Sequence, residues 1–284
     1  MIDLTYDNIN GHPVSQMTYR EWYKAKEGVT EIEAGQFTIG TAKTIEEINE
    51  FMNSQGWFRK VSDWGDGVYS QADLTGCDLD SAKSIASAYQ QVFEKYPQLA
   101  GKLDAPDAHP IGMGDNTYAW CYLRSNGKVE VNPKYYSDWG SVVRHYERDI
   151  ETRWHPEGTT AESIVIHELG HSIDGLLARE GVLGGYTSSG EFRGASASMK
   201  TKVMNRAAKQ DESIAEYWNA KDWSGKADKY WQSYAVEKSV SRYATENAKE
   251  WFAECFAEYI TSAKPRIVAS EFGKELELLM EKLK

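Results

Sequence analysis

Cysteine, basic charge and long apolar runs are all scarce in this chain of 284 residues. Its three cysteines, Cys77, Cys121 and Cys255, are odd in number and widely spaced, which indicates neither a disulfide framework nor a thiolate metal knuckle. We therefore expect a reducing compartment, the cytoplasm, with export by a non-classical route left open. No apolar run approaches the roughly 20 residues of a membrane span. The N-terminus lacks a basic region followed by an apolar core, so no signal peptide is expected.

The formal net charge of −11 argues against two classes of partner. Nucleic acid binding needs a basic face, and an anionic membrane surface attracts basic segments. We therefore expect neither nucleic acid nor a membrane as a partner; the oligomeric state stays open. The length and the hydrophobic content of 41% suit one large globular domain or two small ones.

Histidine is also rare, and two of the six histidines stand in the stretch 167–171, H-E-L-G-H. Two imidazoles four positions apart on a helix lie one turn above each other, so His167 and His171 can hold one metal ion. Glu168 is rotated by about 100° around the axis and can reach the attacking water as a general base. This is the arrangement of zinc hydrolases. The other histidines have no metal spacing and are expected at surface or satisfied structural positions: His12, His109, His145 and His155.

The surroundings of this pattern predict a partly buried helix. Residues 159–162, T-T-A-E, are typical of a capping box with Thr159 as the N-cap. Gly181 is expected to end the helix. A broad apolar surface lies between: Ile164, Val165, Ile166, Leu169, Ile173, Leu176 and Leu177. The alternative is two histidines on a solvated face with Glu168 as a surface charge, but a buried helix is a poor place for unpaired imidazoles.

A catalytic zinc needs a third protein ligand, and no histidine follows His171. The ligand must then be a carboxylate or something less usual. The best candidates lie in residues 247–260, which are helical by pattern and carry Glu250, Glu254 and Glu258 at intervals of four. We expect Glu258 to be solvated. The aromatic neighbours of Glu250 and Glu254 predict burial, for which a metal and a ligand histidine are suitable partners.

Two stretches resemble the signatures of one family of zinc peptidases, the anthrax lethal factor type. They are residues 167–174, H-E-L-G-H-S-I-D, and residues 241–254, S-R-Y-A-T-E-N-A-K-E-W-F-A-E. The resemblance implies that Glu250 is the third ligand of a single Zn²⁺. It also implies that Tyr243 steadies the oxyanion and that Glu254 orients a ligand.

A looser resemblance covers about residues 44–260 and is to zincin-like domains of phage head-morphogenesis proteins. It is carried by residues 74–79, L-T-G-C-D-L, by 95–97, K-Y-P, and by 131–133, V-N-P. The two resemblances imply an α+β, zincin-like metallopeptidase fold of the gluzincin type. This fold is mainly helical, with a small and mostly antiparallel sheet beside the metal helix. Asp174 is implied as a weaker supporting or structural residue.

The chain is expected to divide into an N-terminal arm, residues 1–43, and a metallopeptidase domain, residues 44–284. Residues 44–158 are expected to supply a helix through Met52, a helix over 80–96 and the sheet. Residues 159–284 are expected to supply the metal helix, the glutamate helix, helices around 202–219 and 271–284, and a Gly- and Ser-rich loop at 184–198. That loop either closes over a substrate or is an exposed connection.

An Asn-Gly turn at 126–127 between two β-rich runs predicts a hairpin. In zincins a sheet edge beside the metal helix pairs with an extended substrate. The candidates for that edge are Lys128, Val129, Glu130, Val131 and Asn132. An interior hairpin without substrate contact is an equal alternative.

The function expected from these patterns and resemblances is a zinc-dependent endopeptidase that acts on a protein or peptide substrate, in the cytoplasm or in association with a phage. Two alternatives stay open. One is a non-catalytic zincin-fold module with a structural or interaction role in a phage or prophage. The other is a zinc amidase that acts on a non-protein amide.

Overall fold

A computed structural model of the chain describes residues 38–61, 68–121, 126–188, 190–219 and 240–283, together with the backbone of 8–9 and 12–13. The described part is mainly helical with small antiparallel β-pairs, as the predicted α+β class requires. Most of the predicted N-terminal arm lies outside the described residues. Its last residues belong to the domain, since Ile39 and Ala42 are buried in the core.

The helices of the described part are α2 (Ile45–Ser54), α3 (Leu79–Lys95), α4 (Pro133–Tyr136), α5 (Trp139–Glu151), α6 (Ser163–Arg179), α7 (Ser196–Ala207), α8 (Glu212–Asn219), α10 (Ala248–Thr261) and α11 (Ile267–Met280). Short 3₁₀ turns are η3 (Ile39–Thr41), η4 (Pro97–Leu99) and η5 (Tyr243–Thr245). The strands pair antiparallel: β1 (Asn8–Ile9) with β2 (His12–Pro13), β3 (Lys60–Val61) with β4 (Val68–Tyr69), β5 (Ala119–Cys121) with β6 (Val129–Val131), and β7 (Gly185–Tyr186) with β8 (Phe192–Arg193).

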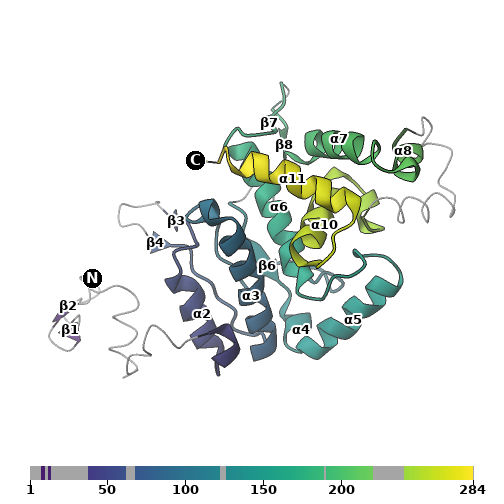
Figure 1. The fold of residues 1–284 in the computed structure, drawn as a ribbon. Helices are drawn as coiled ribbons and strands as arrows, with labels where there is room; N and C mark the ends of the chain where they lie inside the picture. The colour runs from purple at the N-terminus through teal and green to yellow at the C-terminus, as the bar shows by residue number, and fades with distance from the viewer. Residues whose placement is uncertain are drawn as a thin grey trace.

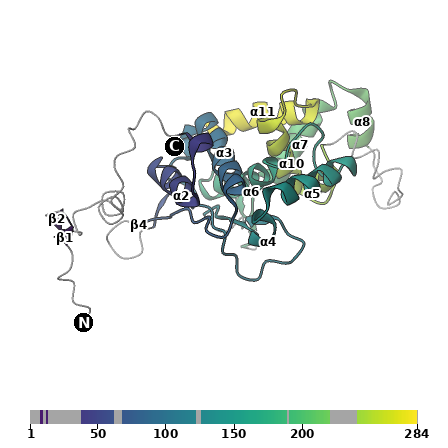
Figure 2. The same ribbon diagram turned by 90° about the horizontal axis from the view of Figure 1, so that it is seen from below.

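Helix α6, which carries the H-E-x-x-H pattern, lies at the centre of the described part. Both views show α2 and α3 on one side of it and α10 and α11 on the other (Figures 1 and 2). Every α6 residue from Ser163 to Ala178 is buried. A helix that is apolar around most of its circumference must be covered on all sides, so its few polar side chains lie in the interior.

Helices α6 and α10 pack at unusually close range. A Cβ placed on Gly170 would lie 2.9 Å from the Cα of Ala253, so only a glycine at position 170 permits this approach. Asn247 caps α10 by accepting hydrogen bonds from the backbone N–H groups of Lys249 and Glu250. The first turn of α10 therefore begins beside the histidine face of α6.

The predicted capping box at Thr159 is wrong. Helix α6 begins at Ser163, and the backbone N–H of Ser163 donates to the carbonyl of Thr160 in a separate turn. The Thr159 hydroxyl instead donates to the carbonyl of Pro156 over 2.6 Å and bonds the Tyr146 hydroxyl over 2.7 Å. These contacts, one local and one with helix α5, compete with capping of α6 by Thr159. The helix end is as predicted, since Gly181 has φ +67°.

The expectation that Glu258 is solvated is also wrong. Its side chain is fully buried. Its carboxylate accepts from the Arg266 guanidinium, with Nε 2.9 Å from Oε1 and Nη2 2.7 Å from Oε2. This two-point pair satisfies a charge that would otherwise be costly to bury. Arg266 lies beyond the end of α10, so the helical spacing of the three glutamates does not reveal it.

The predicted hairpin is present as β5 and β6, with Gly127 at φ +77° in the connection. However, the outer edge of β6 is occupied. The Asp107 N–H donates to the Val129 carbonyl over 3.0 Å, and the Val131 N–H donates to the Asp107 carbonyl over 2.9 Å. The prediction that residues 128–132 form the substrate edge is therefore wrong, because a distant segment already pairs with this strand.

The outer edge of β5 is the one left open. Trp120 is opposite Glu130 in the antiparallel ladder, and Val129 and Val131 direct their backbone groups to Asp107. Successive residues of a strand direct their backbone groups to opposite sides, so Trp120 faces β6 and the N–H and C=O groups of Ala119 face away from it. Within the described segments, no backbone partner meets this edge. Strand β5 lies against α6.

The Gly- and Ser-rich loop at 184–198 forms the exposed β7–β8 hairpin and the start of α7. Figure 1 shows the hairpin at the end of α6 that is remote from α4 and α5. This position agrees with an exposed connection rather than a lid. The helical region expected around 202–219 contains the end of α7 and all of α8, with a turn between Ala207 and Glu212.

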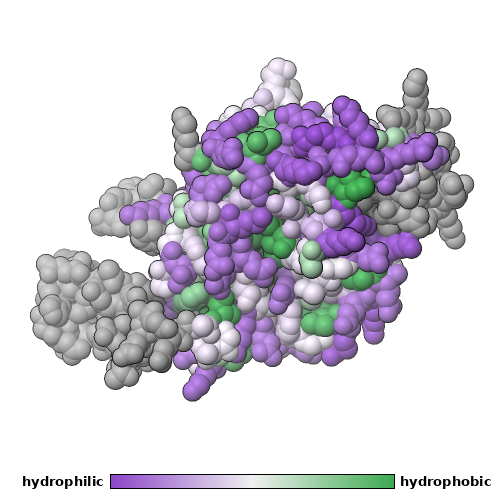
Figure 3. Space-filling view, viewed as in Figure 1, coloured by the Kyte–Doolittle hydropathy of each residue, from purple (hydrophilic) through white to green (hydrophobic). Residues whose placement is uncertain are grey.

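The face seen in Figure 3 is mainly hydrophilic, with small and scattered apolar patches. None of the helices in the described ranges has the length and apolar character needed to cross a bilayer.

Candidate metal centre

Three side chains from two helices converge at the centre of the molecule. The Nε2 atoms of His167 and His171 on α6 each lie 3.2 Å from Oε2 of Glu250 on α10. One ligand atom from each of the three residues lies within 4.8 Å of the others. Both rings are buried and Glu250 is half-buried. The structure thus brings together the three ligands that the sequence predicted.

The spacing of these atoms suits a zinc ion. Zinc binds histidine nitrogen and carboxylate oxygen at about 2.0–2.2 Å in tetrahedral geometry, which places neighbouring ligand atoms about 3.3 Å apart. The two observed separations of 3.2 Å agree with this value. Two histidines and one carboxylate also leave a fourth position for water, as catalytic zinc sites require.

Glu254 lies one turn further along α10 and contacts the ring nitrogen of His167 that faces away from Glu250. Its Oε1 is 2.6 Å from Nδ1 of His167 and 3.2 Å from Nδ1 of His155. Its Oε2 accepts from the Ser241 hydroxyl over 2.6 Å. A carboxylate at the far nitrogen of a ligand histidine fixes the ring orientation and raises the basicity of the ligand. The implied orienting role of Glu254 fits this position.

The electrostatics of the centre favour a positive charge. Burial opposes protonation of His167, but the carboxylates of Glu250 and Glu254 outweigh it and raise the pKa of this histidine to about 10. Burial likewise opposes ionisation of the glutamates, but the histidines lower the pKa of Glu254 to about 2 and that of Glu250 further still. A site that attracts a proton so strongly also suits a divalent cation, which can replace the proton.

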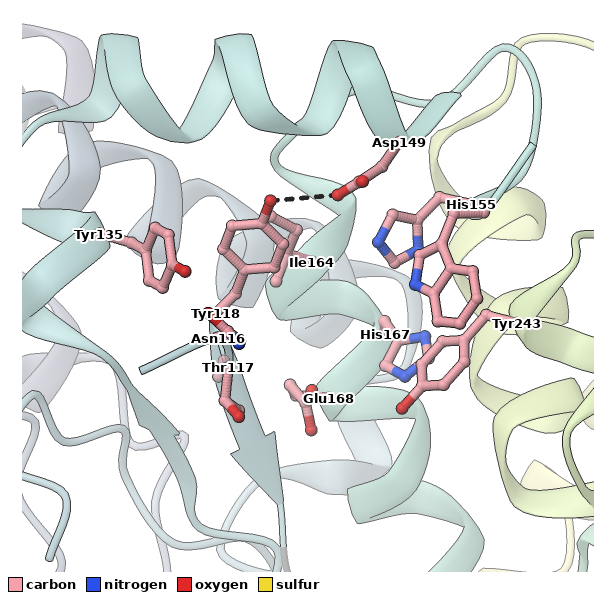
Figure 4. A pocket seen from close by; sticks show the side chains of 12 residues that line it. Asn116, Thr117, Tyr118, Tyr135, Asp149, His155, Ile164, His167, Glu168 and Tyr243 are labelled. Carbon is pink, nitrogen blue, oxygen red and sulfur yellow. Dashed lines mark hydrogen bonds between the residues drawn. The ribbon is translucent and has the colours of Figure 1, made fainter. Parts of the chain in front are cut away.

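Glu168 points into a cavity of about 400 Å³ next to the three converging side chains. Figure 4 shows Glu168, His167 and Tyr243 gathered at one end of this cavity. Burial raises the pKa of Glu168, although the nearby histidines oppose the shift. A raised pKa makes a carboxylate a better proton acceptor. Glu168 lies in the cavity and is not one of the three residues whose ligand atoms converge.

Tyr243 lines the same cavity. Its ring stacks on the His167 ring, with centroids 5.6 Å apart and planes 13° apart, and on Trp154 at 5.1 Å. Burial, followed by the charges of Glu250 and Glu168, raises the pKa of Tyr243 above its ordinary value. The phenol therefore stays protonated and can donate a hydrogen bond at neutral pH.

Asp174 has a structural position. Its Oδ1 accepts from the Ser196 N–H over 2.8 Å, and its backbone carbonyl accepts from Ala195. Gly194 approaches so closely that an added Cβ would overlap the carboxylate at 2.3 Å. Burial raises the pKa of Asp174 to about 6, although bonds to Ser196 oppose the shift. Of its two implied roles, the structural one agrees with these contacts.

His155 is the site residue that the sequence did not identify. It was expected at the surface or as a satisfied structural histidine, yet it lines the cavity and contacts Glu254. Its ring stacks on Tyr146 at 4.9 Å and meets Tyr243 edge-on at 6.2 Å. A backbone bond from the Tyr243 N–H to the Trp154 carbonyl joins the two segments. No helical spacing relates His155 to α6, so the sequence carries no signal for this contact.

Neither a family model nor a curated protein nor a solved structure matches this chain. The function of this chain therefore has to be inferred from its own residues and from the geometry of the centre.

Replacing Glu254 by glutamine is expected to weaken zinc binding by about 10- to 100-fold, because the amide cannot supply the charge that orients His167. Titration of the metal-free protein with zinc against a competing chelator measures this change. Glu277→Gln is a matched control on α11, since Glu277 lies outside the centre. Unchanged zinc affinity in the Glu254 variant would show that this carboxylate has only a packing role.

Proposed function

We propose that this chain is a zinc-dependent endopeptidase with a zincin-like fold of the gluzincin type. The observation that supports this most is the convergence of His167, His171 and Glu250 beside a cavity that also holds Glu168 and Tyr243. The sequence resemblance to the lethal factor type of peptidase, which implies these roles for the same residues, also supports the proposal. We also propose that this chain is related to the zincin-like domains of phage head-morphogenesis proteins.

His167, His171 and Glu250 would hold the zinc ion. When bound, zinc lowers the pKa of a water molecule towards about 7 and polarises a carbonyl. Glu168 accepts a proton from the attacking water and passes it to the leaving amine. The Tyr243 hydroxyl donates a hydrogen bond to the developing oxyanion. Glu254 keeps the His167 ring in its liganding orientation.

The open edge of β5 is the place where we propose that the substrate backbone binds. Ala119 lies on this edge and lines the cavity together with Asn116, Thr117 and Tyr118. An extended peptide can add as a strand to exposed N–H and C=O groups. This strand replaces residues 128–132 as the candidate substrate edge.

Replacing Tyr243 by phenylalanine is expected to lower kcat by about 10²–10³, the usual effect of losing one oxyanion donor. Zinc content should not change, because the stacked ring is retained and the hydroxyl is not a ligand. Steady-state kinetics on one cleaved peptide, with zinc analysis of the same sample, measure both quantities. A kcat equal to that of the wild type would remove Tyr243 from the oxyanion role.

Metal analysis of the purified protein, combined with a random peptide library, tests the proposal as a whole. One zinc ion per chain and cleavage that a chelator abolishes would support it. Zinc without cleavage would favour the structural alternative. Failure to bind zinc would show that the converging side chains are not a metal centre.

A further inference from the structure

The cavity beside the metal centre has a second, chemically distinct end. Figure 4 shows Asp149 at the end of α5 and Tyr118, reaching from the β5 side, joined by a hydrogen bond across the end remote from Glu168. The Tyr118 hydroxyl donates to Oδ2 of Asp149 over 3.1 Å. The cavity is thus lined by a carboxylate that lies apart from the three converging ligands.

Within the described segments, the Asp149 carboxylate has no positively charged partner. Among the residues that the structure describes, no lysine or arginine forms an ion pair with it, and its only side-chain hydrogen bond comes from Tyr118. The guanidinium of Arg242 is held over the Trp154 ring at 5.4 Å and does not line the cavity. His155 does line it, but its Nδ1 faces Glu254.

The walls near this carboxylate are aromatic. The rings of Tyr118 and Tyr135 lie 4.8 Å apart, and both line the cavity. Aromatic faces attract cations, and a carboxylate forms its strongest hydrogen bonds with a charged donor. A cavity of about 400 Å³ is large enough to receive a long side chain.

We infer that this cavity binds the basic side chain, lysine or arginine, of a residue that flanks the scissile bond, and that Asp149 recognises its charge. The inference rests on the proposed peptidase function and names the substrate class. The aliphatic stem of the side chain would lie along the tyrosine rings, and the charged group would reach the carboxylate oxygen that Tyr118 leaves free. The acidic net charge of −11 also favours basic substrates at long range.

The first test compares matched peptides with arginine, lysine, citrulline or norleucine on either side of the cleaved bond. Citrulline has the shape of arginine without its charge. The wild type should prefer the basic peptides, and Asp149→Asn should reduce the ratio of kcat/KM for arginine over citrulline by about 10- to 100-fold, the effect of losing one charged hydrogen bond. Asp149→Glu should retain most of the preference. Glu147→Gln is the control, because it removes an exposed charge from the same helix outside the cavity.

The second test separates this inference from the peptidase function. Binding of arginine amide and citrulline amide to zinc-loaded Glu168→Gln protein is measured by calorimetry, with and without Asp149→Asn. Arginine-selective binding that requires Asp149 supports the basic pocket even if no peptide is cleaved. Cleavage without basic preference, or equal binding of both amides, overturns the pocket and leaves the peptidase proposal intact. Folding of each variant is checked by its thermal unfolding.

Discussion

The Glu168→Gln protein is expected to bind zinc as the wild type does and to lose nearly all peptide hydrolysis. Glu168 lies in the cavity, but it is not one of the three residues whose ligand atoms converge. Glutamine has almost the same shape and cannot accept the proton of the attacking water. General base catalysis typically contributes about 10²–10⁴ in rate, so kcat should fall by that factor. Kinetics on a peptide selected from the library, together with zinc analysis by mass spectrometry, provide both measurements.

The matched control for this variant is Glu180→Gln, which changes an exposed glutamate at the end of the same helix. It should retain the wild-type kcat and zinc content. Wild-type activity in the Glu168 variant would remove Glu168 from the role of base. Loss of zinc in that variant would mean instead that Glu168 contributes to the metal centre.

The His171→Ala protein is expected to lose zinc altogether. It removes one of three donors, and zinc sites with two protein ligands are weak. We expect zinc to bind only the folded wild type, so zinc at 100 times its dissociation constant should stabilise that protein by about 2.7 kcal/mol. The variant should show no such gain. Zinc content after dialysis and the Tm with and without zinc measure the two effects.

His109→Ala is the control for this prediction, since His109 has an exposed side chain outside the centre. It should keep the zinc content and the zinc-dependent rise in Tm. Full zinc occupancy in His171→Ala would show that the proposed ligand set is wrong, whatever the activity of the variant.

Local patterns predicted the elements that carry the centre. The apolar surface of residues 164–177 predicted a buried helix, and α6 is buried over that range. The helical pattern of residues 247–260 predicted the helix that the structure shows as α10. The helix expected through Met52 is present as α2, where the Thr44 side chain caps the first turn by accepting from the Glu47 N–H. These features depend on residues within one or two helical turns, where spacing alone determines which side chains are neighbours.

Predictions failed where a distant residue competes for a polar group. Tyr146 engages the Thr159 hydroxyl that was expected to cap a helix, and Arg266 neutralises Glu258 within the core. Asp107 pairs with the strand that was expected to bind substrate. In each case the local pattern was compatible with the predicted state, but a contact formed on folding stabilised another.

The sequence alone determined which side chains share a helix face: His167 and His171 on one helix, Glu250 and Glu254 on another. The tertiary structure decided that these faces meet, because Gly170 lets α10 approach α6 to contact distance. It also decided that His155 contacts Glu254 and that Asp149 lines the cavity. A helical period fixes neighbours within a few residues, whereas contacts between separate elements depend on how the whole core packs.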